Sequence, residues 1–213
     1  MGIFGRDARR GKCCDAIAAN RLEDLLRVEP VRAGDVILVE AGTVHAIGAG
    51  VVLYELQEYS DITYRLYDYG RLQADGHPRA LHVESGLAVM RFTPPVATFA
   101  RPLTLPPAGP LTRRVLAGCR YFVLEEALLD GEANGNSDPA SCQIVTMLAG
   151  RLEIAAHGGG GCALKLGETA VLPAAMGAYR LAGHAARFMC AYVPSEDDAA
   201  LRAWRAAQSP SAE

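Results

Sequence analysis

A single histidine stands between two glycine-bearing turns in the stretch GTVHAIGAG, residues 42–50. Imidazole is the commonest side-chain ligand for metal ions and also exchanges protons near neutral pH. A lone histidine is nevertheless more often a structural residue. His45 alone therefore leaves both roles open, and the residues around it must decide between them.

Polar and charged side chains recur at alternating positions after this histidine. If the chain runs as a regular strand from residue 51, Glu55 and Gln57 lie side by side on one face. In the next apolar run, the same alternation puts Thr63 on one face with Arg65. We therefore expect Arg65 to point inward, toward a site that Glu55 and Gln57 also face.

The elements that must position these side chains follow from the apolar pattern. Ala18, Leu22, Leu25 and Leu26 have helical spacing, which predicts a helix near residues 14–28. The apolar runs at residues 36–39, 51–59 and 61–69 are rich in Val, Ile, Thr and Tyr, which predicts strands joined by short turns in an antiparallel sheet.

A second all-β unit is expected after a proline-rich segment. Six prolines between residues 93 and 110 exclude a regular helix or a central strand there. Beyond them, short apolar runs alternate with glycine-bearing turns, and the glycine run at 157–162 is expected to be a hairpin tip rather than a phosphate-binding loop. A terminal helix is expected to begin at Ser195 as N-cap, with Asp198 three positions later.

Composition excludes several classes of function. The formal net charge is −3 and no basic stripe is present, so nucleic-acid binding is not expected. No apolar run approaches the ~20 residues that span a bilayer, and the start lacks the apolar region of a signal peptide, which favours a cytoplasmic protein without membrane association. The six cysteines show no C-x-x-C spacing and are expected to be reduced and mostly buried.

The region around the histidine resembles a conserved motif of the cupin superfamily. Gly34-x5-Glu40-x-Gly42-x2-His45 is similar to the cupin pattern Gly-x5-Pro-x-Gly-x2-His, with Glu40 at the proline position. The second unit repeats the first half of the motif from Gly167, but alanines replace the later glycine and the histidine. The resemblance implies two jelly-roll units, of which the second is metal-free.

The longer run GTVHAIGAGVVLYELQEYSDITYRLYDYGR, residues 42–71, is more specific. It resembles the class I mannose-6-phosphate isomerases, zinc-dependent cupin enzymes that interconvert mannose 6-phosphate and fructose 6-phosphate. The resemblance implies that His45 is a zinc ligand and that Arg65 acts at the catalytic centre. The isomerisation moves a proton between C1 and C2 through a cis-enediol, whose developing charge a metal ion and a guanidinium can stabilise.

The resemblance also implies substrate-binding residues. Glu55 matches an acidic residue of the family's pocket, and Gln57 is expected beside it. Asp61 and Thr63 are expected to orient Arg65 or contact sugar hydroxyls, although an Asp-initiated turn explains them equally well. The general base stays open between a tyrosine, a glutamate and a bound water.

The sequence departs from the family in its metal ligands. Catalytic zinc usually has three protein ligands, and in this family a Gln-x-His pair and a glutamate lie upstream of the position that His45 matches. The chain contains no Gln-x-His and resembles the C-terminal two-thirds of a family member. We therefore expect an incomplete first cupin that pairs with a separate N-terminal chain or self-associates.

These inferences define an all-β fold of cupin (jelly-roll) units, the first incomplete, with short flanking helices. The expected function is mannose-6-phosphate isomerase, with a sugar phosphate as the substrate. The alternative is a catalytically inactive cupin that binds a sugar phosphate or a partner subunit. The expected domains are a helical remnant at 1–29, the C-terminal half of the catalytic cupin at 30–92, a linker at 93–110, a metal-free cupin at 111–194, and a terminal helix and tail at 195–213.

Overall fold

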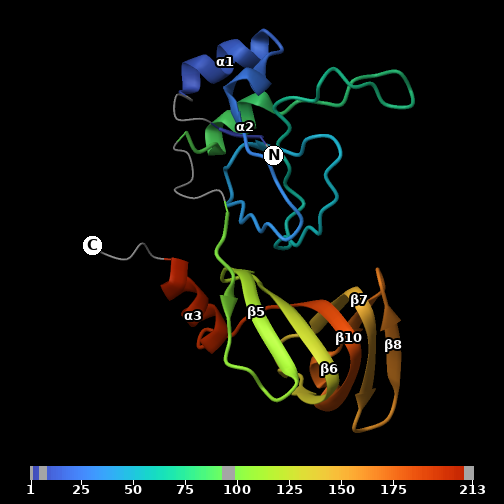
Figure 1. Ribbon diagram of the computed structural model, residues 1–213. Coiled ribbons are helices and arrows are strands. Elements are labelled where there is room, and N and C mark those ends of the chain that lie inside the picture. The colour runs from blue at the N-terminus through green and yellow to red at the C-terminus, as the bar shows by residue number, and fades with distance from the viewer. Residues whose placement is uncertain (1, 5–8, 93–98, 209–213) are drawn as a thin grey trace. The chain divides into compact units, whose positions relative to one another are not determined.

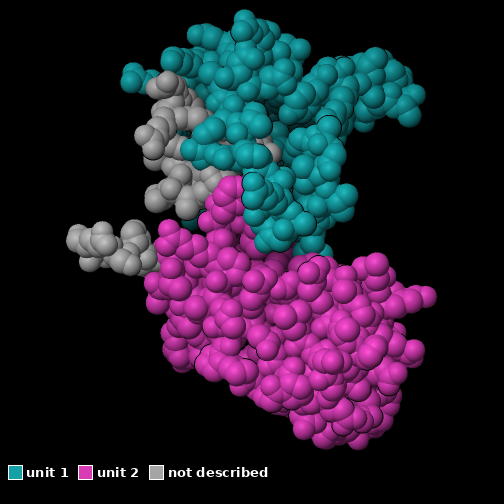
Figure 2. Space-filling model, in the orientation of Figure 1, with its two compact units in different colours: residues 1–35, 39–55, 59–98 teal, residues 36–38, 56–58, 99–213 magenta. Residues whose placement is uncertain are grey.

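The computed structural model describes residues 2–4, 9–92 and 99–208, and its chain divides into two compact units (Figure 2). Residues 93–98 of the expected linker and residues 209–213 of the expected tail lie outside the described residues. Within the described ranges, no helix is long and apolar enough to cross a membrane. Unit 1 comprises residues 1–35, 39–55 and 59–98, and unit 2 comprises residues 36–38, 56–58 and 99–213.

Unit 2 is built on an antiparallel sheet of seven strands, whose long members curve around a common interior (Figure 1). The strand order is β4-β5-β6-β10-β7-β8, and β9 also pairs with β7. β10 pairs with β6 along one edge and with β7 along the other. The strands are β4 (Leu103–Thr104), β5 (Leu111–Gly118), β6 (Val123–Asn136), β7 (Gln143–Ala156), β8 (Gly161–Lys165), β9 (Thr169–Leu172) and β10 (Ala178–Tyr192), with a short 3-10 helix at Ala174–Met176.

The two faces of this sheet bury different clusters. On β6, Leu129 belongs to the inner cluster and Leu124 to a cluster on the other face. Val36 and Leu56, from the two short segments that belong to unit 2, pack against this second cluster. The backbone N–H of Ala100 also donates to the Val36 carbonyl at 2.8 Å. The outer apolar face of the sheet is therefore covered by residues that precede the sheet in the sequence.

The terminal helix α3 (Ala199–Gln208) begins later than the sequence predicts. The Asp198 side chain, not that of Ser195, caps the helix, because its Oδ1 accepts a hydrogen bond from the Leu201 N–H at 2.6 Å. Leu201 and Trp204 are buried in one cluster with residues of β5 and β6. The Trp204 indole N–H donates to the Arg101 carbonyl at 3.1 Å. These contacts fix α3 to unit 2.

Unit 1 has a small sheet and two short helices. The sheet order is β2-β1-β3, with β1 at Gly2–Phe4, β2 at Leu26–Val28 and β3 at His45–Ala46. The α-helices are α1 (Arg10–Ala18) and α2 (Val83–Val89), and a 3-10 helix covers Leu22–Leu25. The buried cluster of this unit consists of Cys13, Leu22, Leu66, Leu87 and Met90.

The single helix predicted near residues 14–28 is wrong in its extent. α1 ends at Ala18, and Asn20 adopts a backbone φ of 56°. Asparagine enters this left-handed region more readily than most residues and commonly ends a helix there. The residues beyond Asn20 form a 3-10 turn and then β2, so the apolar residues at helical spacing belong to three separate elements.

The strands predicted at residues 36–39, 51–59 and 61–69 are not formed. A strand requires a ladder of backbone hydrogen bonds to a neighbouring strand. Within the described ranges, these three runs make only isolated backbone hydrogen bonds. Large apolar side chains in them remain exposed, including Val52, Tyr59 and Ile62. The apolar pattern was typical of strands, but the pairing partners are not among the described residues.

Most of the strands predicted for unit 2 are present. The glycine run forms the connection between β7 and β8, as expected for a hairpin tip. All six cysteines are free. Cys142 and Cys162 are exposed, which corrects the expectation that most of the cysteines are buried. The alternation of apolar residues therefore located β6 to β10, while β5 was not predicted.

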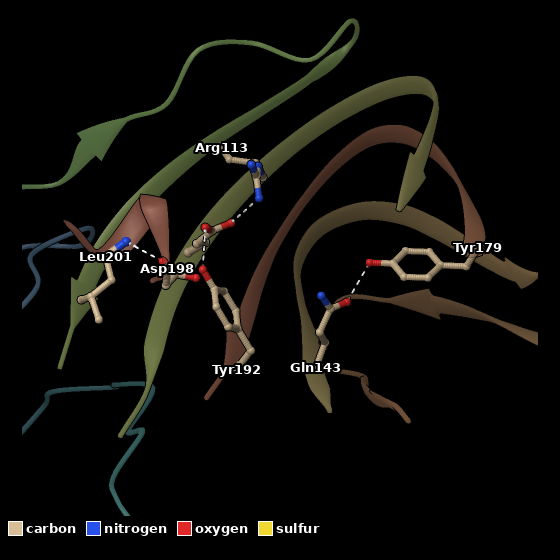
Figure 3. Close-up of polar contacts among 7 residues, drawn as sticks. Arg113, Gln143, Tyr179, Tyr192, Asp198 and Leu201 are labelled. Atoms are coloured by element: carbon tan, nitrogen blue, oxygen red, sulfur yellow. Dashed lines mark hydrogen bonds and ion pairs between the residues drawn. The ribbon is translucent and has the colours of Figure 1, made fainter. Parts of the chain in front are cut away.

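A buried carboxylate lies at the start of β6. The Glu125 side chain is 2% exposed and accepts hydrogen bonds from Arg113 Nη1 at 3.3 Å and from the Tyr192 hydroxyl at 3.4 Å. Figure 3 shows Arg113 and Tyr192 converging on this carboxylate from different strands. A second polar pair forms where the Tyr179 hydroxyl donates to Gln143 Oε1 at 2.7 Å.

Burial governs the ionisation of these groups. It raises the pKa of the Glu125 carboxyl above its usual range, and the positive charge of Arg113 offsets only part of this effect. Burial, together with the charges of Glu125 and Asp198, also raises the pKa of Tyr192. Burial raises the pKa of Tyr179 to about 12. The sheet of unit 2 therefore contains an ionisable carboxyl that is costly to keep charged.

We predict that Glu125→Gln stabilises unit 2 at alkaline pH. The folded-state pKa of Glu125 is raised, so its ionisation penalises folding as the pH rises above the unfolded value of about 4.3. Gln keeps an acceptor for Tyr192 and carries no charge. Melting curves should show a higher Tm for the variant at pH 8, by about 2–4 °C for each 1 kcal/mol gained, and nearly equal values at pH 4.

Glu132→Gln is the matched control for this comparison. Glu132 lies on the same strand, but its side chain is 64% exposed and pairs with Arg180 on the surface. Removing its charge should change the Tm little at either pH. A lower Tm for Glu125→Gln at pH 8 would show that the bond to Arg113 outweighs the cost of burying the carboxylate.

Candidate functional site

His45 is held in an orientation that suits a metal ligand. It lies on β3 opposite Ile3 of β1, and its ring is exposed. Its Nδ1–H donates to the carbonyl of Thr43 at 2.9 Å. This contact leaves the lone pair of Nε2 available for coordination, as in metal sites where a carbonyl fixes the tautomer of a ligating histidine. The geometry therefore fits the metal role expected for His45.

The turn before His45 depends on a glycine. Gly42 has a φ of +84°, and a Cβ at this position would lie 2.7 Å from the Val89 carbonyl oxygen. The Gly42 carbonyl accepts a hydrogen bond from the Arg91 N–H at 2.9 Å, and the Arg91 guanidinium pairs with Glu40. Glu40, which occupies the proline position of the cupin pattern, thus ties the turn to the end of α2.

Arg65 is half-buried and anchored through its backbone. Its N–H donates to His82 Nδ1 at 3.1 Å, and its carbonyl accepts from the His82 N–H at 2.7 Å. Its Nη1 donates to the Ala80 carbonyl at 3.4 Å. The next residue, Leu66, is buried in the core of unit 1. The sequence does not single out His82, which these two hydrogen bonds bring into contact with Arg65.

The acidic residue three positions after Arg65 has a different partner. The Asp68 carboxylate accepts from Arg79 Nε at 2.8 Å, and a second contact joins the same two side chains. The hydrogen bonds from Arg79 hold the pKa of Asp68 below its usual range. Asp68 therefore closes the loop between residues 68 and 79 and leaves the Arg65 guanidinium without a carboxylate partner among the described residues.

The four expected substrate-binding residues are exposed: Glu55, Gln57, Asp61 and Thr63. Their side chains make no hydrogen bond or ion pair within the described ranges. Gln57 belongs to unit 2 and the other three to unit 1. Because the predicted strands are not formed, alternation does not establish which way these side chains face. Their role in substrate binding stays a prediction.

His45 is the one expected metal ligand among the described residues. In the part of the chain that the structure describes, no group of three His, Cys, Asp or Glu side chains could hold a metal ion. A catalytic zinc ion needs about three protein ligands. His45 fits one of these positions, and the described residues do not complete the set.

Comparison with known proteins identifies the relatives of this chain. No protein-family model matches it. It is 35% identical over 172 residues to a mannose-6-phosphate isomerase of Streptococcus mutans, which covers 80% of this chain and 53% of the relative. It is 30% identical over 184 residues to the mannose-6-phosphate isomerase ManA of Bacillus subtilis, which covers 86% of this chain and 57% of the relative.

A solved structure supports the same relationship. The crystal structure of the mannose 6-phosphate isomerase from Bacillus subtilis matches with a TM-score of 0.76 and 28% identity, over 89% of this chain and 58% of that one. The chain is therefore homologous to part of these isomerases, and the expected resemblance and cupin fold are confirmed. It spans between 53% and 58% of the relatives' length, less than the two-thirds that the resemblance implied.

We predict that Gly42→Ala destabilises the turn that carries His45. Alanine would adopt an unfavourable positive φ and collide with the backbone at Val89, at a cost of about 1–3 kcal/mol. Hydrogen exchange at the His45 amide, or the thermal unfolding of unit 1, measures this loss. Gly48→Ala is the control, because among the described residues no atom beyond its chain neighbours lies within 4 Å of the Cβ that it adds. Equal stability of the two variants would contradict the predicted strain.

Proposed function

We propose that this chain supplies part of the active site of a mannose-6-phosphate isomerase. The reaction interconverts mannose 6-phosphate and fructose 6-phosphate by moving a proton between C1 and C2. The observation that carries the proposal is the anchored Arg65, which lies within a sequence region shared with relatives named for this activity. In the proposal, residues 30–92 belong to the catalytic cupin and residues 111–194 form a metal-free cupin.

Arg65 is proposed to stabilise charge on the sugar. Isomerisation through a cis-enediol places negative charge on two neighbouring oxygens, and a fixed guanidinium meets such charge with paired N–H donors. Two backbone hydrogen bonds fix Arg65 in unit 1, and Asp68 pairs with Arg79 instead of Arg65. These contacts support a guanidinium that is both positioned and available to a substrate.

His45 is proposed to be one ligand of a zinc ion, with its Nε2 as the donor atom. When bound, the zinc ion would polarise or orient the sugar oxygens. Glu55, Gln57, Asp61 and Thr63 are proposed to contact the sugar phosphate. Their exposed carboxylate, amide and hydroxyl groups are suited to sugar hydroxyls, and no hydrogen bond to another described residue occupies these side chains.

The remaining ligands are proposed to come from polypeptide outside this sequence. The chain spans little more than half of each relative, and exposed apolar side chains accompany the unpaired runs of unit 1. Additional strands would pair these runs and cover their apolar side chains. Such strands would belong either to the same protein or to a separate chain.

We predict that isomerase activity requires Arg65 and a complementary segment. The test mixes this chain with Zn²⁺ and the part of the Bacillus subtilis isomerase that it does not match, and follows fructose 6-phosphate formation from mannose 6-phosphate. We expect turnover only in the mixture, and a loss of about a hundredfold or more in Arg65→Ala. Arg71→Ala is the control, because Arg71 is exposed and lies over the Tyr69 ring.

Two results would contradict this proposal. Equal turnover by Arg65→Ala and the unchanged chain would remove Arg65 from the reaction. No turnover in the mixture, together with a Tm that rises on addition of mannose 6-phosphate, would favour the alternative of a catalytically inactive cupin that binds a sugar phosphate.

A further inference from the structure

His82 contacts Arg65 in two directions. The Arg65 N–H donates to the His82 imidazole at Nδ1, and the His82 N–H donates to the Arg65 carbonyl. Both backbone groups of Arg65 are thus satisfied by one residue, 17 positions away in the sequence. Because the run around Arg65 pairs with no strand in the described residues, these two bonds take the place of a ladder.

The acceptor role fixes the protonation of the ring. Nδ1 accepts a hydrogen bond from the Arg65 amide, so in this contact the imidazole is neutral and carries its hydrogen on Nε2. The ring is half-buried, and its centroid lies 6.2 Å from that of Tyr64, at an interplanar angle of 57°. His82 therefore contacts both Arg65 and the residue that precedes it.

The imidazole is not used to cap a helix. His82 is the N-cap residue of α2, a position where a side chain usually accepts hydrogen bonds from the first turn. Its side chain makes no capping bond. The ring is directed instead to the Arg65 amide, so an ordinary capping role does not explain the residue type.

Helix α2, which follows His82, packs closely against the segment that contains Arg65. The Gly86 N–H donates to the His82 carbonyl at 2.8 Å. A Cβ at Gly86 would lie 2.5 Å from Leu66 Cδ2 and 3.5 Å from Tyr64 Cβ. Glycine at this position allows α2 to lie directly on the two neighbours of Arg65. The backbone of His82 is thereby held by a packed helix.

We propose that His82 is the positioning residue for Arg65. Its neutral imidazole accepts a hydrogen bond from the Arg65 amide, and its backbone N–H donates one to the Arg65 carbonyl. Together these bonds fix the backbone of Arg65 and thereby orient its guanidinium. The functional part of this inference rests on the proposed role of Arg65 in isomerisation. Positioning matters there because a displacement of about 1 Å at a reacting group can cost about a hundredfold in rate.

Paired variants of His82 test the inference on the whole chain. His82→Asn keeps an acceptor close to the place of Nδ1, whereas His82→Phe keeps a ring beside Tyr64 and removes the acceptor. His82→Gln likewise removes the acceptor from the position of Nδ1, and it adds no apolar ring. It therefore serves as the second variant if His82→Phe does not fold. His77→Asn is the control, because His77 is exposed and no described residue bonds to its ring.

The first measurement is structural and needs no activity. Amide hydrogen exchange should show Arg65 protected in the unchanged chain, in His82→Asn and in His77→Asn, and at least about tenfold less protected in His82→Phe or His82→Gln. Nitrogen NMR of the histidine rings should show the hydrogen of His82 on Nε2. Equal protection of Arg65 in all variants, or a hydrogen on Nδ1, would overturn the inference.

The second measurement uses the complemented isomerase described above. Loss of the acceptor should lower kcat by about tenfold to a hundredfold with little change in KM, and His82→Asn should restore most of it. A purely structural role would lower the melting temperature without this rescue. Unchanged kcat in His82→Phe and His82→Gln would overturn the inference. If the unchanged chain gives no turnover, the proposed function fails, and the exchange result still decides whether His82 holds Arg65.

Discussion

Backbone hydrogen bonding determines which parts of this chain are fixed. In unit 2, long antiparallel strands pair on both sides, and the outer face of their sheet is covered by Val36 and Leu56. In unit 1, a sheet of very short strands and a small buried cluster hold the chain, and its run at 61–69 has no ladder among the described residues. His45 and Arg65 both lie in this less paired unit.

His45 and Arg65, the two side chains with the principal proposed roles, are held by different means. His45 lies on a strand pair, and a carbonyl contact fixes its tautomer. Arg65 lies outside any strand, and a histidine at the start of α2 fixes its amide and carbonyl. Gly42 and Gly86 allow the close approach of α2 and its flanking residues to both segments. Short local contacts thus maintain the site where strand pairing is lacking.

Short apolar runs separated by glycine-bearing turns located most strands of unit 2 in the sequence, because those strands find their partners within the described residues. Runs rich in Val, Ile, Thr and Tyr wrongly predicted strands between residues 36 and 69, since such a run shows a preference for strand but not whether a partner strand is present. The helical spacing of apolar residues predicted a helix to residue 28, but α1 ends before Asn20, which has a positive φ. Motif resemblance singled out His45 and Arg65, whose roles stay predictions, whereas it did not single out His82, because the contact of His82 with Arg65 joins residues 17 positions apart. Glu125 could have been found, since alternation on β6 places it on a buried face.

Zinc binding tests the central claim, that this chain contributes His45 to a metal site completed elsewhere. The measurement is zinc content after dialysis, for the chain alone and for the chain joined to the complementary segment of the Bacillus subtilis isomerase, each with His45 intact or replaced by alanine. The account predicts stoichiometric zinc only in the joined protein with His45. Stoichiometric zinc in the chain alone, retained after His45→Ala, would contradict it.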